Sequence, residues 1–260
     1  RIEVWQAFMI IMLSADFFLP MRALGSYFHV AMNGMAASDR IFKFLSEQEP
    51  KEKTALLPEK GLNISLSDVS FSYDGAKQVL SNVSMDICEN SFTGIVGESG
   101  SGKSTVASLI MGRNTIKKGT LTIGGLNVAD INEDSLFKNI NYVGIGSTFF
   151  KGTVRENLLM AKPNASDEML WSVLAECNID EFFQEENGLD TLLTENAGNL
   201  SGGQKQRLAL ARAILHDAKV YIFDEATSNI DIESEELILS EIKKLARTNT
   251  VIMITHRLMN

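Results

Sequence analysis

A glycine-rich stretch near the middle of the chain carries the clearest chemical signal. It follows the apolar pair Ile95-Val96, precedes a helical run from Thr105, and matches the phosphate-loop pattern with Gly97, Glu98, Ser99, Gly100, Ser101, Gly102, Lys103 and Ser104. Glycines let backbone N–H groups wrap a phosphate, Lys103 adds a positive charge, and Ser104 can hold magnesium. This context indicates a nucleotide-phosphate site, and the alternative is a chance glycine-serine turn.

Two carboxylates follow an apolar run later in the chain. Residues 220–223 read Val-Tyr-Ile-Phe, which is typical of a parallel strand covered on both faces, and Asp224 and Glu225 come next. Ligands of open α/β sheets bind at the carboxyl ends of strands, so Asp224 could order a magnesium ion and Glu225 could polarise a water. Acid pairs also cap helices, but the phosphate loop in the same chain favours the chemical interpretation.

A third motif opens a predicted helix. It consists of Leu200, Ser201, Gly202, Gly203 and Gln204, with Ser201 as a plausible N-cap. Two glycines at a helix start allow an anion to approach free backbone N–H groups. Taken alone, the motif could be a turn and a cap.

The elements that must position these motifs alternate between strands and helices, which indicates an α/β fold. Strands are expected at 62–73, 78–87, 92–96, 220–223 and 250–254. Helices are expected from about Lys103, near 167–177, and at 202–216 and 233–247.

Composition excludes several classes of protein. The 260 residues leave room for one full domain and a smaller part, and 45% hydrophobic residues exclude a disordered chain. A net charge of −9 argues against nucleic acid as a partner. The two cysteines, Cys88 and Cys177, form no CxxC pair, so neither a disulfide framework nor a zinc site is indicated, and a reducing setting fits.

The first part of the chain differs from the rest. Residues 4–32 contain only two charges, Asp16 and Arg22, and the run is long enough to cross a bilayer. The alternative is an ordinary buried helix interrupted by these charges and by Pro20, which predicts a kink. A plausible helix continues over 36–45, and the polar run 46–54 is typical of a linker.

In order and spacing, the three motifs, together with residues 228–231 (Ser-Asn-Ile-Asp) and His256, resemble the nucleotide-binding domain of ATP-binding cassette (ABC) proteins. The resemblance covers roughly residues 61–260, and the signature 200–204 separates this family from other phosphate-loop enzymes. It implies a phosphate-loop NTPase fold with a mixed sheet core and a helical signature subdomain. The chain ends just past His256, so we expect the family's last strand and helix to be missing.

The resemblance also implies the cofactors and the partner. Two such domains would pair head to tail, and each ATP, with Mg²⁺, would lie between one phosphate loop and the partner's equivalent of Ser201–Gln204. Asp231 would belong to the loop that crosses to the partner.

Further roles carry over by position. Glu225 would be the general base, His256 would contact the γ-phosphate, and Asp224 and Ser104 would contact magnesium. Tyr73 matches the aromatic residue that stacks on adenine, although it could be an ordinary strand aromatic, and a lone histidine is more often structural.

One position departs from the family pattern. Where the family usually has a glutamine that touches magnesium and the attacking water, this chain has Ile145. A branched alkyl group cannot replace an amide. The substitution puts the efficiency of this subunit's own site in doubt and motivates a second hypothesis, a regulatory module that hydrolyses poorly.

The N-terminal segment resembles the last membrane helix of half-exporters. This implies a membrane-domain end over 1–48, a linker over 49–60 and a cassette over 61–260, in a bacterial inner membrane with the cassette on the cytoplasmic side. Glu195 is the expected contact with the membrane domain. A soluble cassette ATPase acting on macromolecules is the alternative.

Residues 15–32 are similar to the Cyd-type exporters of cytochrome bd assembly, and more to their D subunit than to their C subunit. This similarity implies a small thiol cargo, cysteine or glutathione, and a second half-transporter subunit in a heterodimer or a homodimer. Lipid, peptide or drug export are the other possibilities.

Overall fold

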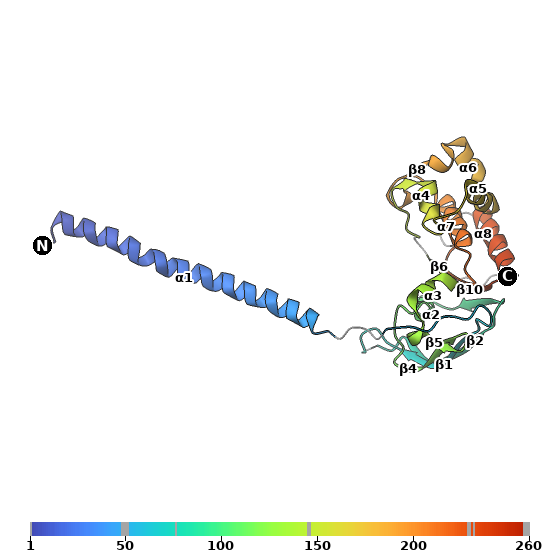
Figure 1. The fold of residues 1–260 in the computed structure, drawn as a ribbon, viewed down its shortest axis with the longest axis horizontal. Coiled ribbons are helices and arrows are strands. Elements are labelled where there is room, and N and C mark those ends of the chain that lie inside the picture. Colours follow the sequence, from blue (N-terminus) through green and yellow to red (C-terminus); the bar gives the residue numbers. More distant parts are fainter. Residues whose placement is uncertain are drawn as a thin grey trace. The chain divides into compact units, whose positions relative to one another are not determined.

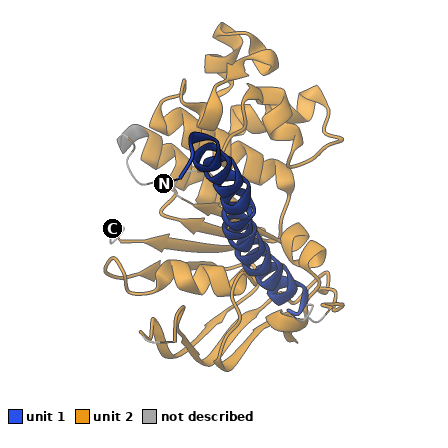
Figure 2. Cartoon of the chain, turned by 90° about the vertical axis from the view of Figure 1, so that its left-hand side faces the viewer, with its two compact units in different colours: residues 1–51 blue, residues 52–260 orange. Residues whose placement is uncertain are grey.

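The computed structural model describes residues 2–47, 52–75, 77–144, 147–227, 230 and 232–256. The chain divides into two units, residues 1–51 and residues 52–260, which are blue and orange in Figure 2. Asp231, predicted to lie in the loop that crosses to the partner, and the departure at Ile145 lie outside the described residues.

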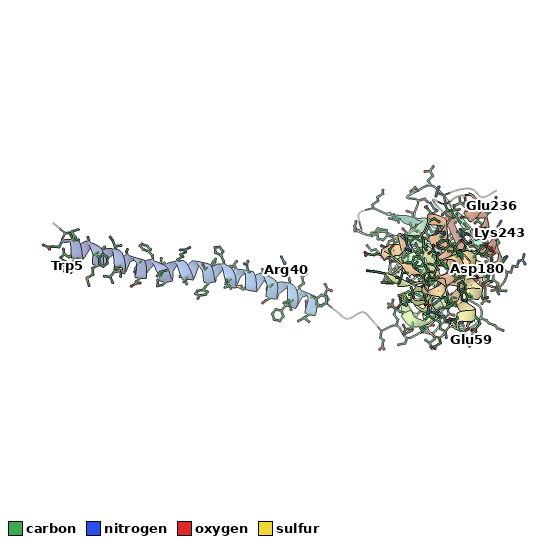
Figure 3. All side chains as sticks on the ribbon, turned by 90° about the horizontal axis from the view of Figure 1, so that it is seen from above. Trp5, Arg40, Glu59, Asp180, Glu236 and Lys243 are labelled. Atoms are coloured by element: carbon green, nitrogen blue, oxygen red, sulfur yellow. The ribbon has the colours of Figure 1, made fainter. Side chains whose placement is uncertain are left out.

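The first unit is one helix, α1, which runs over Val4–Leu45. None of its 42 residues is buried, and Figure 3 shows side chains projecting all around it. Pro20 lies inside the helix, which continues through it as one element (Figure 1), so the sequence-predicted kink does not divide it. By length and apolar composition, α1 could cross a membrane.

The second unit begins with an antiparallel sheet. Its strands lie in the order β2-β1-β4-β5, with β1 at Ile64–Phe71, β2 at Leu80–Ile87, β4 at Lys118–Ile123 and β5 at Leu126–Asn127. The apolar residues of β1 and β4 that face inward belong to one buried cluster.

A separate parallel sheet forms the centre of the unit. Its order is β3-β10-β9-β6, with β3 at Phe92–Val96, β10 at Thr250–Thr255, β9 at Val220–Asp224 and β6 at Ile140–Gly144. Every residue of β9 is buried, as expected for a strand covered on both faces.

Helices complete the unit. They are α2 (Lys103–Ile110), α3 (Glu133–Asn139), α4 (Val154–Leu159), α5 (Asp167–Glu176), α6 (Asp180–Glu185), α7 (Gly202–His216) and α8 (Ile232–Leu245). The two-residue strands β7 (Gly152–Thr153) and β8 (Leu192–Leu193) pair as a small antiparallel sheet. Three short 3-10 turns cover 128–130, 188–190 and 195–197. Helices α4 to α8 gather on the opposite side of the unit from the antiparallel sheet (Figure 1).

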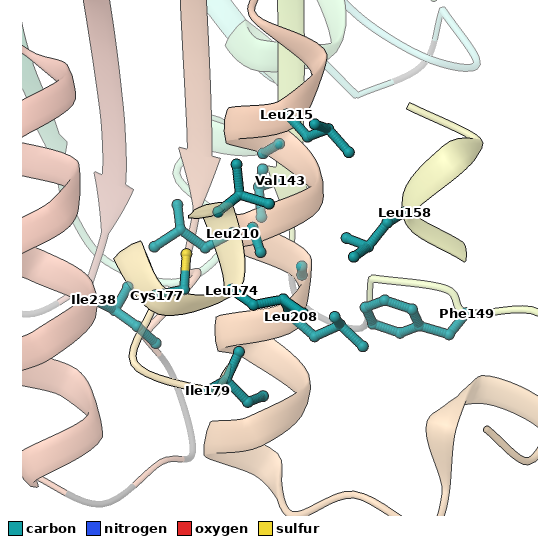
Figure 4. Close-up of a cluster of buried hydrophobic side chains, with 14 of the residues drawn as sticks. Val143, Phe149, Leu158, Leu174, Cys177, Ile179, Leu208, Leu210, Leu215 and Ile238 are labelled. Carbon is teal, nitrogen blue, oxygen red and sulfur yellow. The ribbon is translucent and has the colours of Figure 1, made fainter. Parts of the chain in front are cut away.

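Helix α7 lies at the centre of the helical part. Leu208, Leu210 and Leu215 project from it into a buried cluster that includes Leu158 of α4 and Leu174 of α5 (Figure 4). This packing fixes the direction in which α7 starts, and therefore the place of the motif at its N-terminus.

Candidate functional site

The predicted site residues follow the ends of neighbouring parallel strands. In register, Thr255 of β10 pairs with Val96 of β3, and Asp224 of β9 pairs with Ile254 and with Gly144 of β6. The strands therefore end level with one another, and the segments that follow them share one edge of the sheet.

The phosphate loop connects β3 to α2 and needs glycine at its last position. Gly102 has φ +93°, and a Cβ there would lie 2.7 Å from Leu80 Cδ2 and 3.2 Å from Val79 O. Lys103 is only 8% exposed, and its Nζ donates to the carbonyl oxygens of Gly97 and Glu98, each at 2.8 Å. The ammonium group is thus held inside the loop.

The loop and a catalytic candidate line the same pocket. Its walls come from Val79 and Glu225 and from the loop and helix start at Ser99, Gly100, Gly102, Lys103, Ser104 and Thr105. Tyr73 lies beside this helix start, because its hydroxyl is 3.2 Å from the Thr105 hydroxyl. Tyr73 is 55% exposed, and its ring lies nearly perpendicular to that of Phe71, so much of the residue is open to a ligand.

Glu225 and His256, both predicted site residues, lie next to each other. Glu225 has φ +51°, which is uncommon for a residue with a side chain, and its N–H donates to Ile254 O at 2.9 Å. Its Oε1 lies 3.5 Å from His256 Nδ1. A quarter of the Glu225 side chain is exposed, so the carboxylate can meet a water from the pocket.

Asp224 is buried at the end of β9 with a partner that sequence reasoning missed. The Tyr142 hydroxyl donates to Asp224 Oδ2 at 3.0 Å, and the Arg113 guanidinium lies 5.0 Å from the centre of the Tyr142 ring. Burial, and then the negative charge of Asp224, raise the pKa of Tyr142 to about 12, so the hydroxyl keeps its proton. The pairing of β6 with β9 that brings them together has no local sequence signal.

The donor set suits magnesium. Ser104 offers a hydroxyl oxygen and Asp224 a carboxylate, and Mg²⁺ binds such oxygens through one or two protein ligands while phosphates and water complete the shell. Among the described residues, no group of three or more His, Cys, Asp or Glu side chains could hold a metal. Ser104 and Asp224 therefore fit an ion that arrives with a nucleotide.

The motif at Ser201–Gln204 forms a capping box at the start of α7. Ser201 Oγ accepts from Gln204 N–H at 3.2 Å, and Gln204 Oε1 accepts from Ser201 N–H at 2.8 Å. Ser201 and Gly202 are exposed, whereas Gly203 is buried. Among the described residues that line the phosphate-loop pocket, none belongs to this motif.

The loop ahead of this motif presents Glu195 at the surface. It begins a 3-10 turn that is held by the Asn199 side chain, which accepts from Thr194 N–H at 3.0 Å and donates to Leu192 O at 3.0 Å. The carboxylate of Glu195 is therefore displayed on an ordered loop.

Comparisons with known proteins show what this chain is similar to. A family model described as "ABC transporter" matches residues 80–228. An "Uncharacterized ABC transporter ATP-binding protein" of Haemophilus influenzae is 44% identical over 262 residues, which cover all of this chain and 47% of that protein. An "ATP-dependent lipid A-core flippase" of Mannheimia succiniciproducens is 38% identical over 244 residues, covering 92% of this chain and 42% of that protein.

A solved structure is also similar. The structure of a bacterial Atm1-family ABC exporter with ATP bound has a TM-score of 0.77 and 28% identity, and the match covers 94% of this chain and 43% of that one. The chain thus spans just under half the length of each of these relatives.

Proposed function

Because the chain belongs to the ABC transporter family and carries the family's ATP-binding domain, we propose that it is part of one subunit of an ATP-driven exporter. One observation carries the proposal: the phosphate loop and Glu225 line a single pocket. The exposed, apolar helix α1 ahead of this domain supports export in preference to a soluble cassette ATPase.

The chain's own residues can bind and activate ATP. The backbone of residues 97–102 and the Lys103 ammonium hold the phosphates, and the ring of Tyr73 stacks on the base. Glu225 accepts the proton of the attacking water, and His256 lies beside it to contact the γ-phosphate. Magnesium, when bound through Ser104 and Asp224, supplies positive charge against the phosphate oxygens.

The site is completed by a second cassette. Ser201 and Gly202 are exposed at the start of α7 and do not line the pocket, so this helix N-terminus can meet a nucleotide on another subunit. We therefore assign Ser201–Gln204 and Asp231 to the head-to-tail interface, with a heterodimer or a homodimer as the assembly.

Three regions follow from this assignment. Residues 1–48 are the C-terminal part of the membrane domain, residues 49–60 form a linker, and residues 61–260 form the cassette. The cassette lies on the cytoplasmic side of a bacterial inner membrane. Helix α1 is about 63 Å long at 1.5 Å per residue, roughly twice the thickness of a hydrocarbon core. A membrane-spanning part and a cytoplasmic extension both fit within it.

A small thiol, cysteine or glutathione for cytochrome bd assembly, is the first cargo we propose, because residues 15–32 resemble the Cyd-type exporters. Lipid is the second, since a relative 38% identical over 92% of the chain is described as a lipid A-core flippase.

Transport into inside-out vesicles that contain the full-length protein and its partner tests these proposals. ATP-dependent uptake of labelled cysteine or glutathione that Glu225→Gln abolishes would support a thiol exporter. Hydrolysis without thiol uptake would exclude that cargo, and labelled lipid would be tested next. Recovery of the full-length protein in the soluble fraction would contradict the exporter assignment.

A further inference from the structure

We propose that Tyr142 is a positioning residue for the carboxylate of Asp224, and that Gly144 gives its ring the space to reach that carboxylate. This role rests on the proposed function, because it concerns the side chain assigned there to magnesium. Three contacts of the described residues support it. The Tyr142 hydroxyl donates a hydrogen bond to Asp224, the Tyr142 ring lies close to Gly144, and the Arg113 guanidinium lies over the ring.

The hydrogen bond crosses between neighbouring strands. Tyr142 and Gly144 are two residues apart in β6, so they share one face of the strand, and Gly144 pairs with Asp224 in β9. The phenol ring extends along β6 and lies over Gly144, next to the paired residue Asp224. From there its hydroxyl donates to Asp224 Oδ2 at 3.0 Å.

Gly144 leaves the space that this ring occupies. A Cβ on Gly144 would lie 2.7 Å from the Tyr142 hydroxyl oxygen and 2.8 Å from Cε1, closer than real Cβ contacts. Its φ lies outside the left-handed region, so the backbone itself would accept an alanine. The need for glycine at this position therefore comes from the tyrosine ring.

The ring is also held by a residue that follows the helix after the phosphate loop. Arg113 follows α2, the helix that starts at Lys103, and its guanidinium lies 5.0 Å from the centre of the ring. Tyr142 thus connects the end of the phosphate-loop helix with the carboxylate at the end of β9. A displacement of either element moves the same phenol.

The consequence concerns how Asp224 presents its oxygens. The hydroxyl binds Oδ2 and fixes the rotation of the carboxylate, which leaves Oδ1 for a cation. Hydrogen bonds to metal-binding side chains of this kind typically change metal affinity or activity by about 10- to 100-fold when they are removed. We expect the effect of Tyr142 to lie in this range.

The test removes only the hydroxyl, in the full-length protein. Binding of the non-hydrolysable analogue adenylyl imidodiphosphate is measured with Mn²⁺ and again in EDTA, and the ratio of the two affinities isolates the contribution of the metal. Tyr142→Phe keeps the ring over which Arg113 lies, and we expect this ratio to fall about 10-fold or more. The affinity in EDTA should stay unchanged, and Gly144→Ala should lower the ratio in the same way.

Tyr221→Phe is the matched control. It removes one hydroxyl from β9, but its ring stacks on Phe223 in the other buried cluster, so the ratio should not change. An unchanged ratio in Tyr142→Phe, with hydrolysis still abolished by Glu225→Gln, would overturn the positioning role alone. If neither Glu225→Gln nor Lys103→Ala affected hydrolysis or binding, the proposed function would fall and the positioning role with it.

Discussion

At the scale of single residues, Lys103 is the group whose charge should matter most for nucleotide binding. Its ammonium is buried in the loop and bonded to two carbonyls, so it is already placed where phosphates would replace or join those acceptors. Hydrogen bonds to charged groups contribute about 1.5–3 kcal/mol, so Lys103→Ala should weaken ATP binding roughly 10-fold or more.

Calorimetric titration of ATP into the two proteins measures this difference. Lys118→Ala, which removes an exposed lysine from β4, serves as the control and should bind like the wild type. Equal affinities for wild type and Lys103→Ala would contradict the assignment of the phosphate loop.

Glu225→Gln separates binding from chemistry. The amide keeps the shape of the side chain beside His256 but cannot accept a proton from water. We expect ATP affinity to be retained and turnover to fall by about 10²- to 10⁴-fold, the usual contribution of a general base. Single-turnover hydrolysis measures the loss, and a variant that hydrolyses at the wild-type rate would remove Glu225 from the catalytic role.

Ile145→Gln tests the second hypothesis, a poorly hydrolysing regulatory module. The position follows β6, the strand that ends beside Asp224, and a glutamine there would restore the amide that the family usually offers to the water. We expect a higher steady-state turnover in the variant than in the wild type. An unchanged or lower rate would show that the amide does not limit this site.

Many of the site's residues could be predicted because their signal is local. The loop 97–104, the acids after the run at 220–223 and the motif at 200–204 each occupy adjacent positions in the sequence. Tyr142 was missed because its partner Asp224 is 82 residues away, and the hydrogen bond exists only through the pairing of two strands. The roles of the site residues are still predictions that the variants above will test.

At the scale of elements, β3 and α7 have the bounds that the sequence predicts, at 92–96 and 202–216. An apolar run before a glycine loop marks β3, and the capping box marks the start of α7. β6, in contrast, contains the half-buried polar residues Asn141 and Tyr142 and shows no clear alternation, so no strand was predicted there. The expected strand over 62–73 is shorter, at 64–71.

Asn157 holds helix α4 in place against the segment that precedes it. It is 1% exposed in α4, where its Oδ1 accepts from Phe150 N–H at 2.9 Å and its Nδ2 donates to Phe150 O and Thr153 O, each at 3.0 Å. Asn157→Ala removes these three hydrogen bonds of a buried side chain, each worth about 0.5–1.5 kcal/mol. We expect the midpoint of thermal unfolding to fall by several degrees.

Scanning calorimetry or intrinsic fluorescence of the full-length protein would measure the shift. Asn187→Ala is the control, since Asn187 is exposed and its side chain makes one long hydrogen bond, at 3.4 Å to Asp190 O. A midpoint for Asn157→Ala as high as for this control would show that α4 does not depend on the buried amide.

At the scale of the whole molecule, the reactivity of the two cysteines should show whether the protein is folded. Cys88 is exposed, whereas Cys177 is 2% exposed in the cluster around α7, and burial, then the charge of Glu176, raise the pKa of its thiol. A maleimide should therefore label Cys88 in the native protein and Cys177 only after denaturation. Mass spectrometry of the labelled peptides checks this, and rapid native labelling of Cys177 would mean that the helical part opens readily.

The order of strands in the parallel sheet has a consequence for biosynthesis. β10 is the last of the described strands to be made, yet it lies between β3 and β9. While the ribosome is still adding the residues before Thr250, neither the strand ahead of the phosphate loop nor the strand that ends at Asp224 has this neighbour. Until then β3 and β9 each have an unpaired edge, and unpaired strand edges tend to associate with other chains. A nascent chain therefore cannot assemble the nucleotide pocket until β10 has left the exit tunnel, and chaperone protection should matter most just before that moment.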